Sequence, residues 1–349
     1  MNRIVRPLSL LPLLASALAW SAPPPAEHPS DQPRGQFLGA QSTHYPDWFL
    51  SSFLELAEDV DQAAAADKRI IVLFVQDGCP YCHALVNLNL SQKHIHDYLR
   101  AHFDIVLINL WGDREVLAAG GQTYTEKTFA AALNVQFTPT LLFMDENGGI
   151  VLRLNGYLPP ARFQTALRYV AERREHTQTY TDYLAEHAPP AAAGALNGQP
   201  FFRPAPHDLS QRRGQPIAVF FEQRQCPNCD HLHQHVLQDP ATREEVARTA
   251  SIQLDMWSDT PVITPNGDAL TARAWAQRLN VQYAPTIVLF NGDGDEVIRS
   301  EAFFKTFHTS GLFEYVRTAA YRRQPSFQRW LSARAERWRE QGIDVDIWK

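Results

Sequence analysis

The 349-residue sequence has few cysteines, little excess of basic charge and hardly any long apolar runs. Four cysteines are too few to hold together a disulfide-stapled scaffold. The formal net charge of -6 disfavours a protein that binds nucleic acid by general electrostatic attraction. Beyond the N-terminus, no segment is long and apolar enough to span a bilayer. The hydrophobic fraction of 45% is nevertheless ordinary for a folded protein, and the length predicts about two domains.

The N-terminus has the pattern of a secretory signal peptide over residues 1–19. Arg3 and Arg6 precede an apolar stretch over residues 8–18, and A-L-A at residues 17–19 is a small-x-small cleavage site. An uncleaved membrane anchor is the alternative, but the apolar stretch is short and two prolines interrupt it. We therefore expect a protein that is secreted into an oxidising compartment, the periplasm.

The rest of the chain contains one unit twice. Both copies begin with an apolar run followed by a C-P-x-C motif. Three blocks recur in the same order at separations of 147, 146 and 146 residues: C-P-Y-C at 79–82 with C-P-N-C at 226–229, W-G-D at 111–113 with W-S-D at 257–259, and LNVQFTPT at 133–140 with LNVQYAPT at 279–286. This regularity indicates a tandem duplication.

Each unit alternates strands with helices, which predicts an α/β fold with a central mixed sheet flanked by helices. The predicted strands include residues 70–74, 104–110 and 140–144 and their counterparts 217–221, 251–256 and 286–290. After each motif we predict one helix, over residues 84–99 and 230–249, and then a polar loop follows the second strand. The predicted organisation is a signal peptide (1–19), a proline-rich tether (20–45), two domains (46–176 and 207–324) joined by a linker (177–206), and a helical tail (325–349) docked on the second domain.

The cysteine pairs are the candidate catalytic residues. Each motif opens a helix, so Cys79 and Cys226 stand where unpaired backbone N–H groups and the helix dipole stabilise a thiolate. A lowered thiol pKa makes such a cysteine a nucleophile at neutral pH. Cys82 and Cys229 lie one turn further along and are predicted to resolve the mixed disulfide.

Two other interpretations of the cysteines are weaker. A zinc site needs four ligands, and its two C-x-x-C pairs normally lie close together in sequence, whereas each pair here belongs to its own repeat. A purely structural disulfide across two residues closes too small a loop to stabilise much. Redox chemistry is therefore the favoured interpretation.

The order of strand, C-P-x-C helix, and then T-P or A-P before another strand resembles the thioredoxin fold, twice. In that family the proline is cis and lies beside the cysteine pair, a place taken here by Pro139 after Thr138 and by Pro285 after Ala284. The resemblance implies that Thr138, Pro139, Ala284 and Pro285 bind substrate, by presenting backbone to an extended segment.

A narrower resemblance is to the SoxW-type periplasmic thioredoxins. It rests on residues 45–49, 77–82, 111–115 and 136–140 and on the tail from 325 to 346. It implies that a membrane thiol-reductant protein donates the electrons. It also implies that a periplasmic sulfur-carrier or cytochrome-maturation protein receives them.

The sequence departs from thioredoxin beside the cysteines. Thioredoxin has a buried aspartate six residues before its first cysteine, where this chain has Leu73 and Phe220. Asp77 or Glu222 is a possible substitute, although spacing alone does not aim either carboxylate at a resolving cysteine. A thioredoxin-like redox potential is therefore not implied.

We expect an extracytoplasmic thiol–disulfide oxidoreductase, in the first place a reductase of protein disulfides, with no organic cofactor and no metal. An oxidase or isomerase is the nearest alternative. A copper-handling protein that uses the thiolates with His231 or His235 is another, and so is a chain in which only one domain is catalytic. Trp111 and Trp257 recur, but the sequence does not separate a packing role from substrate contact. The direction of electron flow and the oligomeric state also stay open.

Overall fold

The computed structural model describes residues 33–187, 194–211, 214–302 and 304–349. The predicted signal peptide lies outside the described residues, as do most of the predicted tether and part of the predicted linker. Residues 34–349 form one compact unit. Among the described residues, no helix has both the length and the apolar character needed to cross a membrane.

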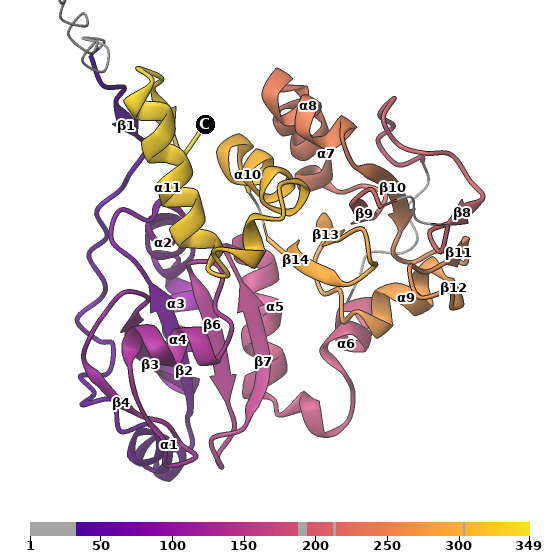
Figure 1. Cartoon of the computed structure of the whole chain (residues 1–349). Helices are drawn as coiled ribbons and strands as arrows, with labels where there is room; N and C mark the ends of the chain where they lie inside the picture. Colours follow the sequence, from indigo (N-terminus) through magenta and orange to yellow (C-terminus); the bar gives the residue numbers. More distant parts are fainter. Residues whose placement is uncertain (1–32, 188–193, 212–213, 303) are drawn as a thin grey trace, which may run out of the picture. The chain divides into compact units, whose positions relative to one another are not determined.

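Two four-stranded sheets organise this unit, one in each half of the chain (Figure 1). The strand orders are β3-β2-β6-β7 and β10-β9-β13-β14. In each sheet the first pairing is parallel and the other two are antiparallel. The strands are β2 (Arg69–Val75), β3 (Phe103–Asn109), β6 (Thr140–Met144), β7 (Ile150–Asn155), β9 (Ile217–Glu222), β10 (Ala250–Asp255), β13 (Thr286–Phe290) and β14 (Glu296–Ser300). The predicted α/β fold with two equivalent mixed sheets is confirmed.

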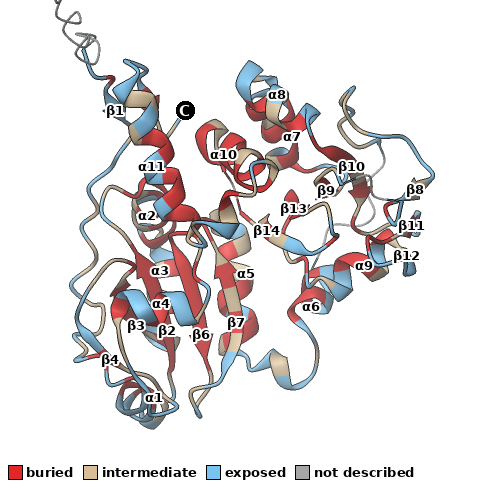
Figure 2. Cartoon of the chain, viewed as in Figure 1, coloured by how far each residue is buried: buried red, intermediate tan, exposed pale blue. Residues whose placement is uncertain are grey.

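The two central strands of each sheet are buried on both faces, as Figure 2 shows by their red colour. Runs of Val, Ile, Leu and Phe produce this burial, and helices or loops must then cover both faces. Alternate residues enter different apolar clusters: Leu73 and Phe220 belong to one cluster that spans both halves, whereas Phe74 and Phe221 belong to separate clusters on the other faces. A shared core therefore joins the two domains.

The helix that follows each motif is shorter than predicted. In the first half, α2 (Pro80–Ala84) continues as a π-helical segment and ends before α3 (Lys93–His102). The side-chain amides of Asn87 and Gln92 donate to carbonyl oxygens four residues back, at 2.9 and 2.7 Å, and so compete with the regular helical ladder. The single helix predicted over residues 84–99 is therefore wrong.

The second half breaks its predicted helix, residues 230–249, for a different reason. The first part, α7 (Pro227–Gln234), ends before α8 (Pro240–Ala247), whose first residue is a proline that cannot continue a preceding helix. Asp239 caps α8, because its Oδ1 accepts a hydrogen bond from Thr242 N at 2.8 Å. The remaining helices are α1 (Leu56–Ala65), α4 (Glu126–Ala132), α5 (Pro160–Ala171), α6 (Tyr180–Glu186), α9 (Ala272–Arg278), α10 (Thr306–Arg317) and α11 (Phe327–Glu340).

Each half also has a small hairpin where the sequence predicts a polar loop. β4 (Glu115–Leu117) pairs with β5 (Thr123–Thr125), and β11 (Pro261–Ile263) pairs with β12 (Ala269–Thr271). β11 also pairs with β8 (His207–Asp208). Strands of two or three residues are too short to produce a readable alternation of apolar and polar residues.

The predicted linker contains the helix α6, which packs on the first domain. Tyr180 and Tyr183 are buried, and their ring centres lie 5.0 and 5.4 Å from that of Tyr169 on α5. Thr179 caps the helix by accepting a hydrogen bond from Asp182 N at 3.1 Å. Residues 177–187 are therefore an ordered extension of the first domain.

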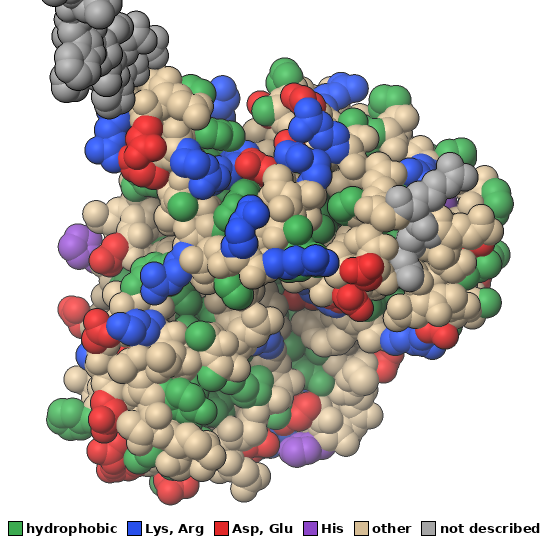
Figure 3. All heavy atoms as spheres, in the orientation of Figure 1, with side chains coloured by type: hydrophobic (Ala, Val, Ile, Leu, Met, Phe, Trp, Pro, Cys, Tyr) green, Lys and Arg blue, Asp and Glu red, His purple; other side chains and the backbone are tan. Residues whose placement is uncertain are grey.

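The tail helix α11 packs on the second domain, as expected, through a buried arginine. Arg334 donates to Glu314 of α10 at 2.6 Å and to Ser310 Oγ at 3.1 Å, and its guanidinium lies 3.9 Å from the ring centre of Trp338. Figure 3 shows Lys and Arg side chains over α10 and α11, with acidic side chains among them. Charges of both signs thus share this face of the molecule.

The beginning of α11 also packs on the first domain, which was not predicted. Phe327 N donates to Gln136 Oε1 at 2.9 Å, and Gln328 Nε2 donates to the Gln136 carbonyl oxygen at 3.2 Å. After the helix, β15 (Val345–Asp346) pairs in parallel with β1 (Phe37–Leu38), beside α11 in Figure 1. The end of the predicted tether is thus bound to the body of the protein.

His308 of α10 is a buried titratable group where the two domains meet. Its Nδ1 lies 3.4 Å from the Tyr81 hydroxyl, and the two ring centres are 5.1 Å apart. Burial, helped by the nearby positive charge of Arg334, lowers the pKa of His308 to about 3 from 6.5. The native state therefore excludes a proton that the unfolded chain binds.

We predict that acidification destabilises the fold through His308. Between the native and unfolded pKa values only the unfolded chain is protonated, so the free energy of unfolding falls as the pH drops through that window. For this residue the loss at pH 5 is about 2 kcal/mol relative to pH 7. His308→Gln should lessen the loss in urea unfolding at the two pH values. His176→Gln, at a histidine with 66% of its side chain exposed, is the matched control and should not. An unchanged pH dependence in His308→Gln would contradict the prediction.

Candidate active sites

Both cysteine pairs stand at the start of a helix, immediately after a central strand. β2 and β9 each lead through a short turn that needs a left-handed residue, Gly78 with φ +72° in the first copy and Gln225 with φ +49° in the second. The first cysteine is the N-cap residue and a proline follows at the first helical position. The turn thus aims the first cysteine's sulfur at the free amides of the helix.

The sulfur of each first cysteine accepts a backbone hydrogen bond from the second. Cys82 N lies 3.0 Å from Cys79 Sγ, and Cys229 N lies 3.0 Å from Cys226 Sγ. In the dithiol form these amides, together with the helix dipole, stabilise a thiolate on the first cysteine. The structure holds both pairs as disulfides, Cys79–Cys82 and Cys226–Cys229.

The two predicted proline positions lie beside the sulfurs. The Thr138–Pro139 and Ala284–Pro285 peptide bonds are both cis. Cys79 Sγ is 3.5 Å from the Thr138 carbonyl oxygen, and Cys226 Sγ is 3.5 Å from that of Ala284. The structure therefore assembles the eight predicted site residues into two groups of four.

The residue before the proline distinguishes the two sites. The Thr138 hydroxyl donates to Cys79 Sγ at 3.3 Å, and Ala284 has no such donor. Thr138 and Ala284 are nevertheless both buried, with 4% and 6% of their surface exposed. The substrate-binding role that the family resemblance implies for these residues stays a prediction.

A tryptophan and a glutamine form a pair beside each site. Trp111 Nε1 donates to Gln76 Oε1 at 2.9 Å, and Trp257 Nε1 donates to Gln223 Oε1 at 3.1 Å. Gln76 and Gln223 lie three residues before the first cysteine of their motif. Our sequence analysis missed both glutamines, although their separation of 147 residues equals that of the motifs.

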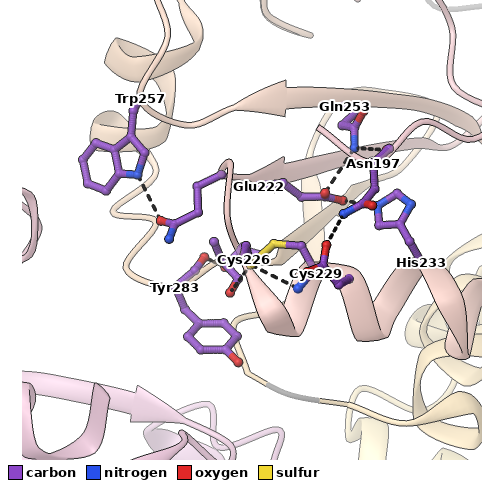
Figure 4. Close-up of a disulfide and its surroundings, with 12 residues drawn as sticks. Asn197, Glu222, Cys226, Cys229, His233, Gln253, Trp257 and Tyr283 are labelled. Carbon is purple, nitrogen blue, oxygen red and sulfur yellow. Dashed lines mark hydrogen bonds and ion pairs between the residues drawn. A yellow bond between two sulfur atoms is a disulfide. The ribbon is translucent and has the colours of Figure 1, made fainter. Parts of the chain in front are cut away.

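The second site has a buried acid–base pair next to its cysteines. The Glu222 side chain is fully buried at the end of β9, and its Oε1 lies 2.8 Å from Nε2 of His233, which is also buried. His233 follows Cys229 by four residues on α7, so the two side chains share one helix face. Figure 4 shows Glu222 directed toward this helix, near the disulfide.

Amide side chains complete the hydrogen bonds of this pair. Gln253 Nε2 donates to Glu222 Oε2 at 3.1 Å, and Gln199 Nε2 lies 3.2 Å from His233 Nδ1. An amide donor at Nδ1 leaves the proton on Nε2, so the imidazole donates to Glu222. Two hydrogen bonds, one to each carboxyl oxygen, thus hold the Glu222 side chain in place.

The first site has no counterpart of that pair. Val75 occupies the position of Glu222, and Val86 that of His233. Asp77, the other carboxylate considered from sequence, is exposed in the turn before Cys79. Of the two acids, Glu222 is therefore the one placed to serve a resolving cysteine.

The first site is enclosed by other parts of the chain instead. Tyr81, inside the motif, is 2% exposed and its hydroxyl accepts a hydrogen bond from Lys305 N at 3.0 Å. The Tyr81 ring packs edge-on against Phe304 and Trp348. Burial raises the pKa of Tyr81, so its hydroxyl stays protonated. The dipeptide between the cysteines thus serves as a packing element between domains.

A pocket of about 190 Å³ leads to the first cysteine pair. Its inner wall comes from the first domain. Its outer wall comes from α10 and the residues just before it, from α11, and from the segments around the paired strands β1 and β15. The lining residues are Phe37, Gln76, Asp77, Gly78, Cys79, Pro80, Tyr81, Trp111, Thr138, Phe304, Phe307, His308, Gln328, Leu331, Ser332, Ala335 and Ile347. Access to Cys79 is therefore shaped by residues far from it in sequence.

The histidines considered as metal ligands lie close together, His231 on α7 and His235 directly after its last residue. The ring centres of His231 and His235 are 4.7 Å apart. Burial, followed by the influence of His235, lowers the pKa of His231. In the described part of the chain, no group of three or more His, Cys, Asp or Glu side chains has an arrangement that could hold a metal ion.

Comparison with known proteins agrees with this geometry. The model of the family described as thioredoxin-like domain matches residues 56–171 and again residues 208–310. No curated protein matches the chain.

Solved structures of similar fold each match about one domain. A thioredoxin-fold protein from Helicobacter pylori is 23% identical, with 39% of this chain and 91% of that chain covered and a TM-score of 0.29. A thioredoxin from Thermus thermophilus is 24% identical, with 39% and 87% covered and a TM-score of 0.27. The oxidised C-terminal domain of DsbD from Neisseria meningitidis is 16% identical, with 37% and 99% covered and a TM-score of 0.26.

The two regions that match the family model make up more than half of the chain, and each contains its own C-P-x-C disulfide. The chain therefore belongs to the thioredoxin-like family, as a thiol–disulfide oxidoreductase with two cysteine pairs.

Proposed function

We propose that this protein is an extracytoplasmic reductase of protein disulfides, similar in role to the SoxW-type thioredoxins. The observation that carries the proposal is the second site. Its first cysteine stands at a helix start, and its second is fully buried beside the Glu222–His233 pair. Pro227 of that motif is exposed and Asn228 half-buried, so a protein partner has room to approach.

Electron transfer at the second site takes two steps. The Cys226 thiolate attacks one sulfur of the partner disulfide, forms a bond to it, and the other partner sulfur leaves as a thiolate. Cys229 then gives its proton to Glu222 and attacks Cys226 Sγ, which releases the remaining partner sulfur as a thiolate. Two electrons reach the partner, and the Cys226–Cys229 disulfide is the oxidised product.

Another protein dithiol must then reduce that disulfide. The SoxW resemblance supports a membrane thiol-reductant protein as donor. It also supports a sulfur-carrier or cytochrome-maturation protein as acceptor. The signal-like N-terminus supports a periplasmic location, where an incoming supply of electrons is needed to keep thiols reduced.

We predict that the second pair has a reduction potential below about −230 mV, in the range of reducing thioredoxins. The variant Cys79→Ser/Cys82→Ser isolates this pair, and equilibration with dithiothreitol measures it. A value near −120 mV, the range of disulfide-forming oxidants, would instead support the oxidase alternative. The converse variant, Cys226→Ser/Cys229→Ser, gives the potential of the first pair.

We predict that Glu222→Gln slows the resolving step at the second site. The amide keeps the size of the side chain but cannot accept the Cys229 proton, so release of the mixed disulfide should slow by on the order of ten-fold or more near neutral pH. Quenched-flow alkylation of the second-site-only variant would measure this step. The pH dependence of the step should change as well, which a merely structural role of Glu222 would not require.

The first site supplies the matched control for Glu222. Val75 is the equivalent residue there, and Val75→Ala should leave the resolving step of the first pair on the same pH profile. If Glu222→Gln resolved its mixed disulfide at the original rate across pH, the proton-acceptor role would be wrong.

We predict that the mature protein begins just after residue 19 and is found in the periplasm. Osmotic-shock fractionation of Gram-negative cells that express the full chain, followed by intact mass measurement, would test both statements. Recovery of the full-length mass in the membrane fraction would favour the uncleaved anchor. Recovery in the cytoplasm would contradict the proposed location.

A further inference from the structure

The first cysteine pair lies in a pocket that is poorly suited to a folded protein. Cys79 and Cys226 are similarly buried, at 3% and 5% exposed, so the difference lies in what surrounds them. Pro80 and Tyr81 are buried, whereas their counterparts Pro227 and Asn228 are exposed and half-buried. A folded protein can contact the second motif directly, whereas at the first motif α10 and α11 stand in its way.

The tail helix also covers the stretch that leads to the first cis-proline. Gln136 accepts two hydrogen bonds from the start of α11, one on its side chain and one on its carbonyl oxygen. The Phe137 ring lies 5.7 Å from that of Phe327 and 5.1 Å from that of Phe304. An extended peptide that approached Thr138 from this side would have to displace these contacts.

The size of the pocket limits the part of a ligand that can enter it and reach Cys79. Pockets for drug-sized molecules usually enclose about 300–1,000 Å³. The pocket at Cys79 encloses about 190 Å³, so it fits a smaller molecule.

The lining of the pocket sets the polarity of that ligand. The apolar side chains in the lining include Phe37, Phe304, Phe307, Leu331, Ala335 and Ile347. Gln76, Thr138, Gln328 and Ser332 add uncharged polar groups. His308 is neutral at physiological pH because burial lowers its pKa to about 3, and the one carboxylate, Asp77, is exposed at the turn. An uncharged ligand with a few polar atoms fits this lining.

We propose that the first site acts on small, uncharged organic disulfides, whereas protein disulfides are handled by the second site. This inference rests on the proposed thiol–disulfide function and assigns a separate substrate class to one of its two sites. The Cys79 thiolate attacks one sulfur of the small disulfide, bonds to it, and expels the other as a thiolate. Cys82 then attacks Cys79 Sγ, and its thiol proton passes to the departing sulfur, so that the second half of the small disulfide leaves as a thiol. The remaining Cys79–Cys82 disulfide is reduced by a protein dithiol.

The test compares the first, nucleophilic step at each site. Cys82→Ser/Cys226→Ser/Cys229→Ser leaves Cys79 alone, and Cys79→Ser/Cys82→Ser/Cys229→Ser leaves Cys226 alone. Each reduced variant is mixed with bis(2-hydroxyethyl) disulfide or with insulin, and mass spectrometry follows the mixed disulfide. The ratio of the small-disulfide rate to the insulin rate cancels differences in thiolate reactivity.

We expect this ratio to be at least about ten-fold larger for Cys79 than for Cys226, because only the first site excludes the protein sterically. Glutathione disulfide, which is larger and charged, should react with Cys79 more slowly than bis(2-hydroxyethyl) disulfide. Equal ratios at the two sites would overturn the inference and leave the proposed function intact. No reaction of either variant with either disulfide would count against the proposed function itself.

A second pair of variants tests the pocket without changing a cysteine. Ser332 lines the pocket and is exposed on α11, so Ser332→Trp should obstruct the mouth and slow the Cys79 reaction with the small disulfide by on the order of ten-fold. Ala333→Trp adds the same bulk to the next exposed residue of the helix, outside the lining, and should leave that rate unchanged. If both substitutions had the same effect on Cys79, the pocket would not be the route to the sulfur.

Discussion

The burial of Tyr81 is the contact on which the arrangement of the two sites depends. This residue lies between the cysteines of the first motif in sequence, yet its hydroxyl accepts the Lys305 amide and its ring packs against the aromatic side chains of Phe304, His308 and Trp348. A phenol buried in this way keeps its proton and needs a hydrogen-bond partner, which the second domain provides. The first redox site is thus part of the interface between domains, and cannot be opened without disturbing that interface.

The duplication kept the parts that make a thiolate and changed the parts that surround it. The helix start, the cis-proline and the Trp–Gln pair recur in both copies with nearly the same distances. Two of the changes alter the surroundings most, Val75 against Glu222 and Tyr81 against Asn228, and a third replaces Thr138 by Ala284. The first change places a buried glutamate near the cysteines of the second copy only, and the second change buries the motif of the first copy. Two sites that share the cysteine motif and the cis-proline thus have different surroundings.

Much of this could be predicted from the sequence because the decisive signals are local. A buried strand, a C-P-x-C motif and a proline before the next strand predict two groups of four site residues. In the structure, the four residues of each group lie close to one another. Glu222 was considered from the sequence, but its partner His233 was not. His233 lies eleven residues further on a helix, and the packing of that helix decides where its side chain points. The packing of Tyr81 could not be predicted at all, since its partners lie more than two hundred residues away.

The broken helices are a different case: Pro240 was a readable signal, whereas the π-helical turn after residue 84 arises from side-chain amides that compete with the backbone.

The tail helix shows how one element can serve the stability of one domain and the specificity of the other. Arg334 is nearly fully buried, and burial lowers its pKa, yet the Glu314 carboxylate, the Ser310 hydroxyl and the Trp338 ring hold it as a cation in the second domain. Removing any one of these partners leaves a buried charge short of compensation, which is more costly than the loss of an exposed ion pair. The same helix carries Gln328 and Ser332 into the pocket of the first site. Because α11 contacts Gln136 of the first domain as well as Glu314 of the second, the shape of the pocket at Cys79 depends on contacts with both domains.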